Sequence, residues 1–148
     1  MTYELDKAQF ENVLKLAAFS DGDTGGNPAG VVVAPEHPSV AEMQRIAAEV
    51  GFSETAFAAP VAGTASLWRV RFFAPAAEVP FCGHATIALG AVLARERGDG
   101  LFHLQLNDAA ITVEGRREGK LFAAALQSPP THSKPAPAEL AQEFLDLF

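Results

Sequence analysis

The chain has 148 residues, of which 49% are hydrophobic and 20% are charged, so it can enclose a core, and disorder over most of its length is excluded. Eleven Lys and Arg against eighteen Asp and Glu give a net charge of -7, which excludes a nucleic-acid partner because the basic surface that binds phosphates is missing. One cysteine cannot form an intramolecular disulfide, and the four histidines lack zinc-site spacing, so we expect no metal.

The N-terminal segment carries acidic residues and no apolar run of the kind found in secretory signals. Nowhere do eighteen apolar residues follow one another. We therefore expect no leader, no membrane anchor and a reducing, cytoplasmic compartment, which the single cysteine also favours.

The first part of the chain predicts a strand, a loop and a second strand. Residues 12–19 are apolar and β-compatible, and residues 20–28 are rich in Gly, Asp, Ser and Pro. Residues 29–34 are mostly Val and Ala and end at a proline, which is typical of a short strand.

An amphipathic helix is predicted over residues 40–50. Ser39 and Glu42 have the spacing of an S-x-x-E capping box, and apolar residues recur at helical spacing after them. Gly51 follows at the position where a left-handed residue commonly ends a helix.

Strands over 54–59 and 65–73 come next, the second with apolar residues alternating along one face. Residues 85–94 are apolar on every side and predict a helix buried almost all round, as a helix inside a curved sheet would be. Three short strands, 102–106, 111–116 and 121–127, then predict an antiparallel meander.

The last segment changes in composition. Residues 1–128 are interpreted as one domain, and residues 129–148 as a Pro-rich linker that leads into the start of an amphipathic helix from residue 138. Leu140, Phe144 and Leu147 would form the apolar stripe of that helix and would need a partner to cover them.

Three clusters have a composition suited to chemistry. The loop around Asn27, between Gly25 and Gly30, could present backbone N–H groups to an anion, or it could be only a sharp turn. Glu54 lies between apolar or small neighbours, where a partly desolvated carboxylate suits acid/base work, although it could equally cap a strand or face water.

The third cluster is Cys82, Gly83 and His84, directly before the apolar helix. Free N–H groups at such a helix start favour a bound carboxylate and lower the pKa of a thiol, so the backbone from Cys82 through Ala85 and Thr86 is a candidate substrate site. The alternative is a capping histidine beside a small buried cysteine.

Together the segments GNPAGV (26–31), GFSETAF (51–57) and EVPFCGHAT (78–86) resemble the PhzF-like family, the phenazine-biosynthesis isomerases related to diaminopimelate epimerase. The resemblance implies an α+β fold, a β-roll or barrel of mostly antiparallel strands around the central apolar helix. It further implies cofactor-free proton transfer on a small carboxylated substrate. Glu54 would be the general acid/base, His84 would lie beside it, and the loop at Asn27 would help to hold the substrate.

One departure from that family concerns length. Its members typically carry two such domains with the active site between them, and the second domain contributes an aspartate and a Gly-Ser-Ala-type motif. This sequence stops after the linker. Two hypotheses follow: an isomerase that two copies assemble as a homodimer, or a catalytically silent anion-binding module or fragment of a two-domain enzyme.

Overall fold

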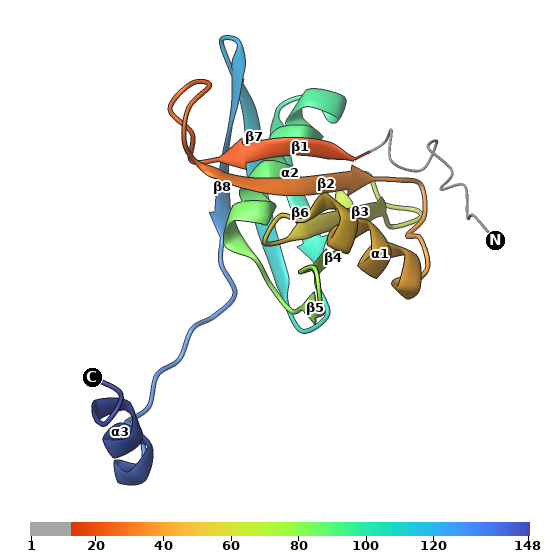
Figure 1. Ribbon diagram of the computed structural model, residues 1–148. Helices are drawn as coiled ribbons and strands as arrows, with labels where there is room; N and C mark the ends of the chain where they lie inside the picture. The colour runs from red at the N-terminus through yellow and green to blue at the C-terminus, as the bar shows by residue number, and fades with distance from the viewer. Residues whose placement is uncertain (1–12) are drawn as a thin grey trace, which may run out of the picture.

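The computed structural model describes residues 13–148 (Figure 1), so the predicted start of the first strand at residue 12 lies outside the described residues. Eight strands form one curled mixed sheet, in the order β1-β2-β3-β4-β6-β7-β8, with β5 paired to β4. The strands are β1 (Leu14–Ala18), β2 (Asn27–Val33), β3 (Thr55–Pro60), β4 (Leu67–Phe73), β5 (Glu78–Val79), β6 (Gly100–Gln105), β7 (Ala110–Glu118) and β8 (Leu121–Gln127). The helices are α1 (Val40–Val50), α2 (Gly83–Arg97) and α3 (Ala138–Leu145).

The predicted α+β roll around a central helix is confirmed. Most neighbouring strands are antiparallel, but β2 pairs with β3, and β4 pairs with β6, in parallel. The chain crosses through α1 in the first case, and through β5 and α2 in the second, as parallel pairs require. Figure 1 shows α2 enclosed by the curled sheet, and α1 outside it.

Helix α1 has the predicted bounds because both of its ends are capped. The Ser39 hydroxyl accepts a hydrogen bond from the Glu42 N–H at 3.2 Å, and Gly51 ends the helix in the left-handed region at φ 72°. Only half of the predicted capping box forms, since the Glu42 carboxylate accepts from Arg45 Nε at 3.0 Å.

The meander β6-β7-β8 is confirmed, with one shift at its second turn. The strands predicted at 111–116 and 121–127 leave residues 117–120 between them, whereas β7 continues to Glu118, which pairs with Leu121 and leaves only Gly119 and Lys120 in the turn. The two-residue strand β5 was not predicted, because so short a segment has no periodicity.

Small residues let α2 approach the sheet closely. A Cβ atom on Gly115 would lie 2.3 Å from the carbonyl oxygen of Gly90, and a Cβ on Gly90 would lie 2.5 Å from Val113 Cγ2. Leu89, Val92 and Leu93 of the helix are fully buried against the sheet. The apolar composition on every side of this segment therefore corresponds to a helix that strands surround.

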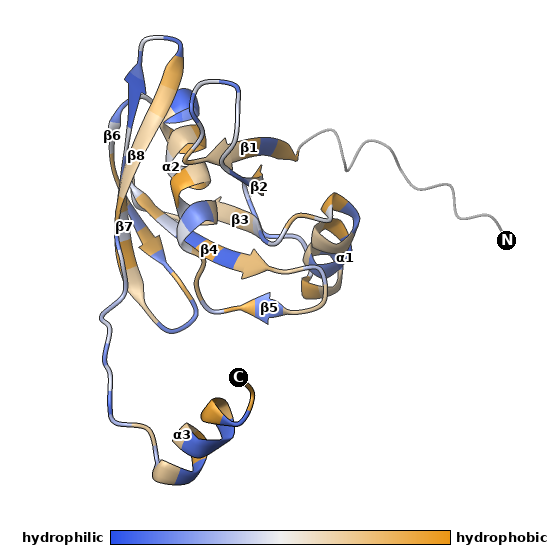
Figure 2. Ribbon diagram, turned by 60° about the vertical axis from the view of Figure 1, so that its left-hand side comes forward, coloured by the Kyte–Doolittle hydropathy of each residue, from blue (hydrophilic) through white to orange (hydrophobic). Residues whose placement is uncertain are grey.

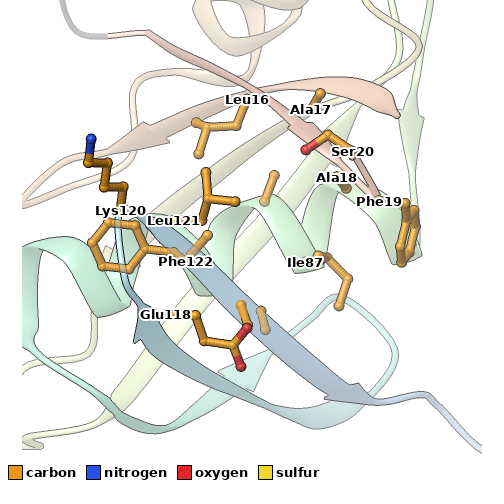
Figure 3. Close-up of a pocket in the computed structure, with 14 residues that line it drawn as sticks. Leu16, Ala17, Ala18, Phe19, Ser20, Ile87, Glu118, Lys120, Leu121 and Phe122 are labelled. Carbon is orange, nitrogen blue, oxygen red and sulfur yellow. The ribbon is translucent and has the colours of Figure 1, made fainter. Parts of the chain in front are cut away.

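The sheet does not close, so the prediction that α2 is covered almost all round needs one correction. Strands β1 and β8 are the two ends of the sheet, and between them lies a pocket of about 500 Å³. Figure 3 shows its lining side chains, among which Ile87 and Ala91 of α2 are only half-buried. One side of the central helix therefore faces this opening.

Helix α3 lies apart from the sheet (Figures 1 and 2), begins at the predicted residue 138 and ends at Leu145. Its apolar stripe is exposed: Leu140 by 43%, Phe144 by 60% and the following Leu147 by 74%. Across residues 13–148, no helix is both long and apolar enough to cross a membrane. The division into residues 1–128 and 129–148 stays a prediction.

Candidate active site

Two of the three predicted clusters meet at one point of the structure. The Oε2 atom of Glu54 lies 3.7 Å from Nε2 of His84, and the other ring nitrogen of His84, Nδ1, lies 3.1 Å from the sulfur of Cys82. All three side chains offer a donor atom within 4.8 Å of the other two. We call Glu54, Cys82 and His84 the acid/base cluster.

The sheet positions Glu54 at one end of the parallel pair β2–β3. The N–H of Gly30 donates to the carbonyl oxygen of Glu54 at 3.3 Å, which fixes this residue directly before β3. The next residue, Thr55, is fully buried and packs closely on Gly30. A Cβ atom on Gly30 would lie 2.7 Å from Thr55 Oγ1. The Glu54 side chain is 22% exposed, so it is partly desolvated and still reachable, as predicted.

Helix α2 positions the other two members. Cys82 is its N-cap residue, and the Cys82 carbonyl oxygen accepts from both the N–H (3.1 Å) and the hydroxyl (2.7 Å) of Thr86. His84 follows in the first turn, with its side chain 11% exposed. The buried start of the helix therefore holds the imidazole in place.

The predicted lowering of the Cys82 pKa is wrong. Burial, with the nearby negative charge of Glu54, raises the pKa of the Cys82 thiol to about 11, although backbone N–H groups of Ala85 and His84 act in the opposite direction. Desolvation outweighs the helix terminus because the sulfur is buried. At neutral pH this thiol is therefore protonated.

Ser53 belongs to the site, although the motifs did not single it out. Its hydroxyl oxygen lies 3.3 Å from Nε2 of His84, the same nitrogen that faces Glu54. Its position next to Glu54 in the S-E-T segment was the available indication. The imidazole therefore has polar neighbours on both of its nitrogens.

An ion pair that was also not predicted supports the segment leading into α2. The Arg71 guanidinium donates to both carboxylate oxygens of Glu78, at 2.8 and 2.7 Å, and Asn107 Nδ2 donates to the same carboxylate at 2.7 Å. These bonds hold the pKa of the Glu78 carboxyl below its usual range. They fix β5, which lies only three residues before the N-cap of α2, against β4.

The remaining candidates differ in what they can offer to a ligand. Asn27 is exposed at the first position of β2. Because β2 and β3 are parallel, Asn27 and Glu54 both lie toward the N-terminal ends of these two strands. Ala85 and Thr86 are fully buried, and the N–H of Thr86 already donates to the Cys82 carbonyl at 3.1 Å, so neither side chain reaches a ligand and the Thr86 N–H is engaged within the helix. Gly83 leaves room at the helix start, since a Cβ there would meet only Phe81, at 4.0 Å.

The structure is therefore an α+β roll in which the carboxylate of Glu54 and the imidazole of His84 meet at the start of the central helix. Residues 16–146 match the phenazine biosynthesis-like protein family, PhzC-PhzF. The chain belongs to this family, as its motifs predicted.

Curated relatives and solved structures agree with this assignment. The chain is 46% identical over 111 residues to an uncharacterized isomerase of Escherichia coli O157:H7, a match over 72% of this chain and 37% of that protein. A predicted epimerase from Pseudomonas aeruginosa superposes with a TM-score of 0.72 at 26% identity, over 77% of this chain and 41% of the other. A putative PhzC/PhzF protein from Clostridium difficile gives 0.65 at 30% identity, over 74% and 41%.

Each match involves only part of the relative. The aligned part of this chain spans 37% of the Escherichia coli protein and 29% of a similar uncharacterized isomerase from Deinococcus radiodurans. The chain therefore spans well under half the length of the curated relatives it matches.

Proposed function

We propose that the chain acts as an isomerase or epimerase, moving a proton on a small carboxylated metabolite with Glu54 as the acid/base. The observation that carries the proposal is the pairing of Glu54 with His84 at the start of α2, 3.7 Å apart. Relatives named isomerases, and a family named for phenazine biosynthesis, support this activity and suggest a carbon acid of that pathway as the substrate.

In the proposed reaction, the Glu54 carboxylate removes a proton from a carbon next to a carbonyl or carboxyl group, and the electron pair moves onto the oxygen as an enolate. The carboxylic acid of Glu54 then returns the proton at another carbon or on the other face, so no cofactor is consumed. The setting of Glu54 suits both steps because its side chain is partly buried and 22% exposed, so the carboxylate is held in place and remains within reach of a substrate.

His84 is proposed to orient Glu54 and to donate to the developing enolate. A neutral Cys82 thiol can donate its S–H weakly to Nδ1, which leaves the proton of the imidazole on Nε2, toward Glu54 and Ser53. The substrate carboxylate is placed over Gly83, where the first N–H groups of α2 and the helix dipole favour negative charge. Asn27 would contact the substrate from β2.

Assembly and location complete the proposal. A second copy of the chain, paired as a homodimer about a two-fold axis, would cover the cluster and the exposed stripe of α3. The free thiol of Cys82 within the site fits the cytoplasm, where cysteines stay reduced.

Hydrogen exchange in D2O tests the proposal directly. Amino and keto acids are incubated with the protein, and deuterium on carbon is followed by NMR. Incorporation above the protein-free rate is the expected result. Saturable binding of carboxylates without any incorporation would overturn it and favour the alternative, a silent anion-binding module.

A further inference from the structure

The fold brings together three metal donors that the sequence spacing does not reveal. One thiol, one imidazole and one carboxylate from Cys82, His84 and Glu54 have donor atoms within 4.8 Å of one another. Donor atoms around a tetrahedral zinc ion, with bonds of about 2.0 to 2.3 Å, lie about 3.5 Å apart. The sulfur of Cys82 lies 3.1 Å from Nδ1 of His84, close to that value, and one donor atom from each of the three side chains lies within 4.8 Å of the other two, so modest side-chain movements bring them to this spacing around one ion.

The chemistry of the three donors selects among metals. Sulfur and imidazole nitrogen suit Zn²⁺ and similar borderline-soft ions, whereas Mg²⁺ and Ca²⁺ prefer oxygen ligands alone. Three protein ligands also leave a fourth position for water or for the carboxylate of a bound molecule.

The supporting structure is largely formed before an ion arrives. Cys82 and His84 lie two residues apart at a helix start that the double hydrogen bond from Thr86 to the Cys82 carbonyl holds in place. Glu54 is tied to β2 through its own carbonyl. The exposed fractions of Glu54 (22%) and His84 (11%) leave a route for an ion from solvent.

We propose that Glu54, Cys82 and His84 form a three-ligand binding site for Zn²⁺. On binding, the thiol gives its proton to solvent and its sulfur bonds to the metal as a thiolate, while Glu54 and neutral His84 contribute one atom each. The proposal goes beyond the acid/base function, and an ion in this position inhibits that function because it occupies the carboxylate that must carry the proton.

Metal titration of the full 148-residue chain tests the site without using turnover. After treatment with EDTA, Zn²⁺ is added and followed by calorimetry, and Co²⁺ is added as a coloured probe. One saturable site per chain and a near-ultraviolet thiolate-to-cobalt charge-transfer band are expected, both unaffected by a hundredfold excess of Mg²⁺. Absence of saturable binding, or Co²⁺ binding without that band, would overturn the proposal.

Two variants distinguish this cluster from surface histidines. Cys82→Ser keeps the size of the side chain and removes the sulfur, so it should abolish the charge-transfer band and weaken Zn²⁺ binding at least tenfold. His103→Gln alters an exposed histidine on β6 and should change neither. Equal loss in both variants, with unchanged circular dichroism, would contradict the site, whereas loss of deuterium exchange alone would concern only the proposed enzyme activity.

Discussion

The imidazole of His84 lies between Cys82 and Glu54, with Nδ1 3.1 Å from the sulfur and Nε2 3.7 Å from the carboxylate. Each ring nitrogen therefore has a different nearest neighbour, and the Glu54 carboxylate also lies close enough to Cys82 to act on its thiol directly. In this arrangement the Cys82 thiol fixes the tautomer of the imidazole, and the Glu54 carboxylate is the group placed to exchange a proton with a ligand.

Replacing Glu54 by Gln should lower the exchange rate by roughly two to four orders of magnitude, because the amide keeps the shape and cannot carry the proton. Initial rates of deuterium incorporation measure the change. Glu114→Gln, at an exposed position of β7, is the matched control and should keep the full rate. Full activity in Glu54→Gln would rule out this residue as the acid/base.

Gly83→Ala should separate stability from ligand binding. The new methyl group would meet only Phe81, at 4.0 Å, and alanine favours a helix by about 0.5–1 kcal/mol over glycine, so the melting temperature should stay or rise. The methyl would nevertheless stand where the substrate carboxylate is placed, and KM should rise about tenfold.

The control for Gly83→Ala is Gly100→Ala, where a Cβ meets nothing within 4 Å. That variant should leave KM unchanged. An unchanged KM in both would mean that the carboxylate does not bind over the start of α2.

Two buried threonines should respond in opposite ways to replacement by valine. Within the described residues, Thr55 Oγ1 is a buried side-chain atom without a hydrogen-bond partner, so Thr55→Val should raise the free energy of unfolding by about 1 kcal/mol. The Thr86 hydroxyl donates to the Cys82 carbonyl at 2.7 Å, so Thr86→Val should lower the free energy of unfolding by about 1–2 kcal/mol. Urea unfolding of the two variants measures both, and equal changes would contradict the assigned hydrogen bonds.

The ion pair between Arg71 and Glu78 predicts a pH dependence of stability. The pKa of Glu78 is lower in the folded chain than its ordinary value of 4.5, so its contribution is fully present above that pH and is lost as the pH falls through the lowered folded value. Glu78→Gln should cost about 1 kcal/mol at pH 7, allowing for the partial exposure of the pair, and should flatten the acid side of the stability curve.

The control for Glu78→Gln is Glu118→Gln, which breaks an ion pair with Arg116 whose side chains are 46% and 56% exposed. That loss should be close to zero at every pH. If both variants change stability equally, burial does not strengthen the Arg71–Glu78 pair.

Local interactions explain which parts of the fold could be predicted. The bounds of α1 follow from Ser39 and Gly51, whose capping geometry depends on a few neighbouring residues. The β6-β7-β8 meander likewise depends on short turns, whereas β5 has only two residues, too few for a periodic pattern, and is held against the neighbouring β4 by the ion pair between Glu78 and Arg71.

The site was predicted as separate clusters, because their meeting depends on long-range pairing. Glu54 reaches the start of α2 only once β2 and β3 pair in parallel and the helix lies inside the sheet. Tertiary burial also raises the pKa of Cys82, where the helix terminus alone predicted a lowered pKa. The helix terminus is a local feature of the sequence, whereas desolvation depends on the whole fold. Family resemblance supplied the link between Glu54 and His84 that residue patterns alone left open.

The exposed stripe of α3 predicts self-association. Leu140, Phe144 and Leu147 are 43%, 60% and 74% exposed, and apolar side chains at this spacing are normally covered by another surface. Sedimentation velocity at micromolar concentration should therefore show a dimer. Phe144→Ser should weaken it by at least about tenfold, because a single buried aromatic residue often dominates an interface. Glu143→Ser, a neighbouring exposed position, should leave it intact. A wild-type monomer that still catalyses deuterium exchange would show that a second copy is not needed to complete the site.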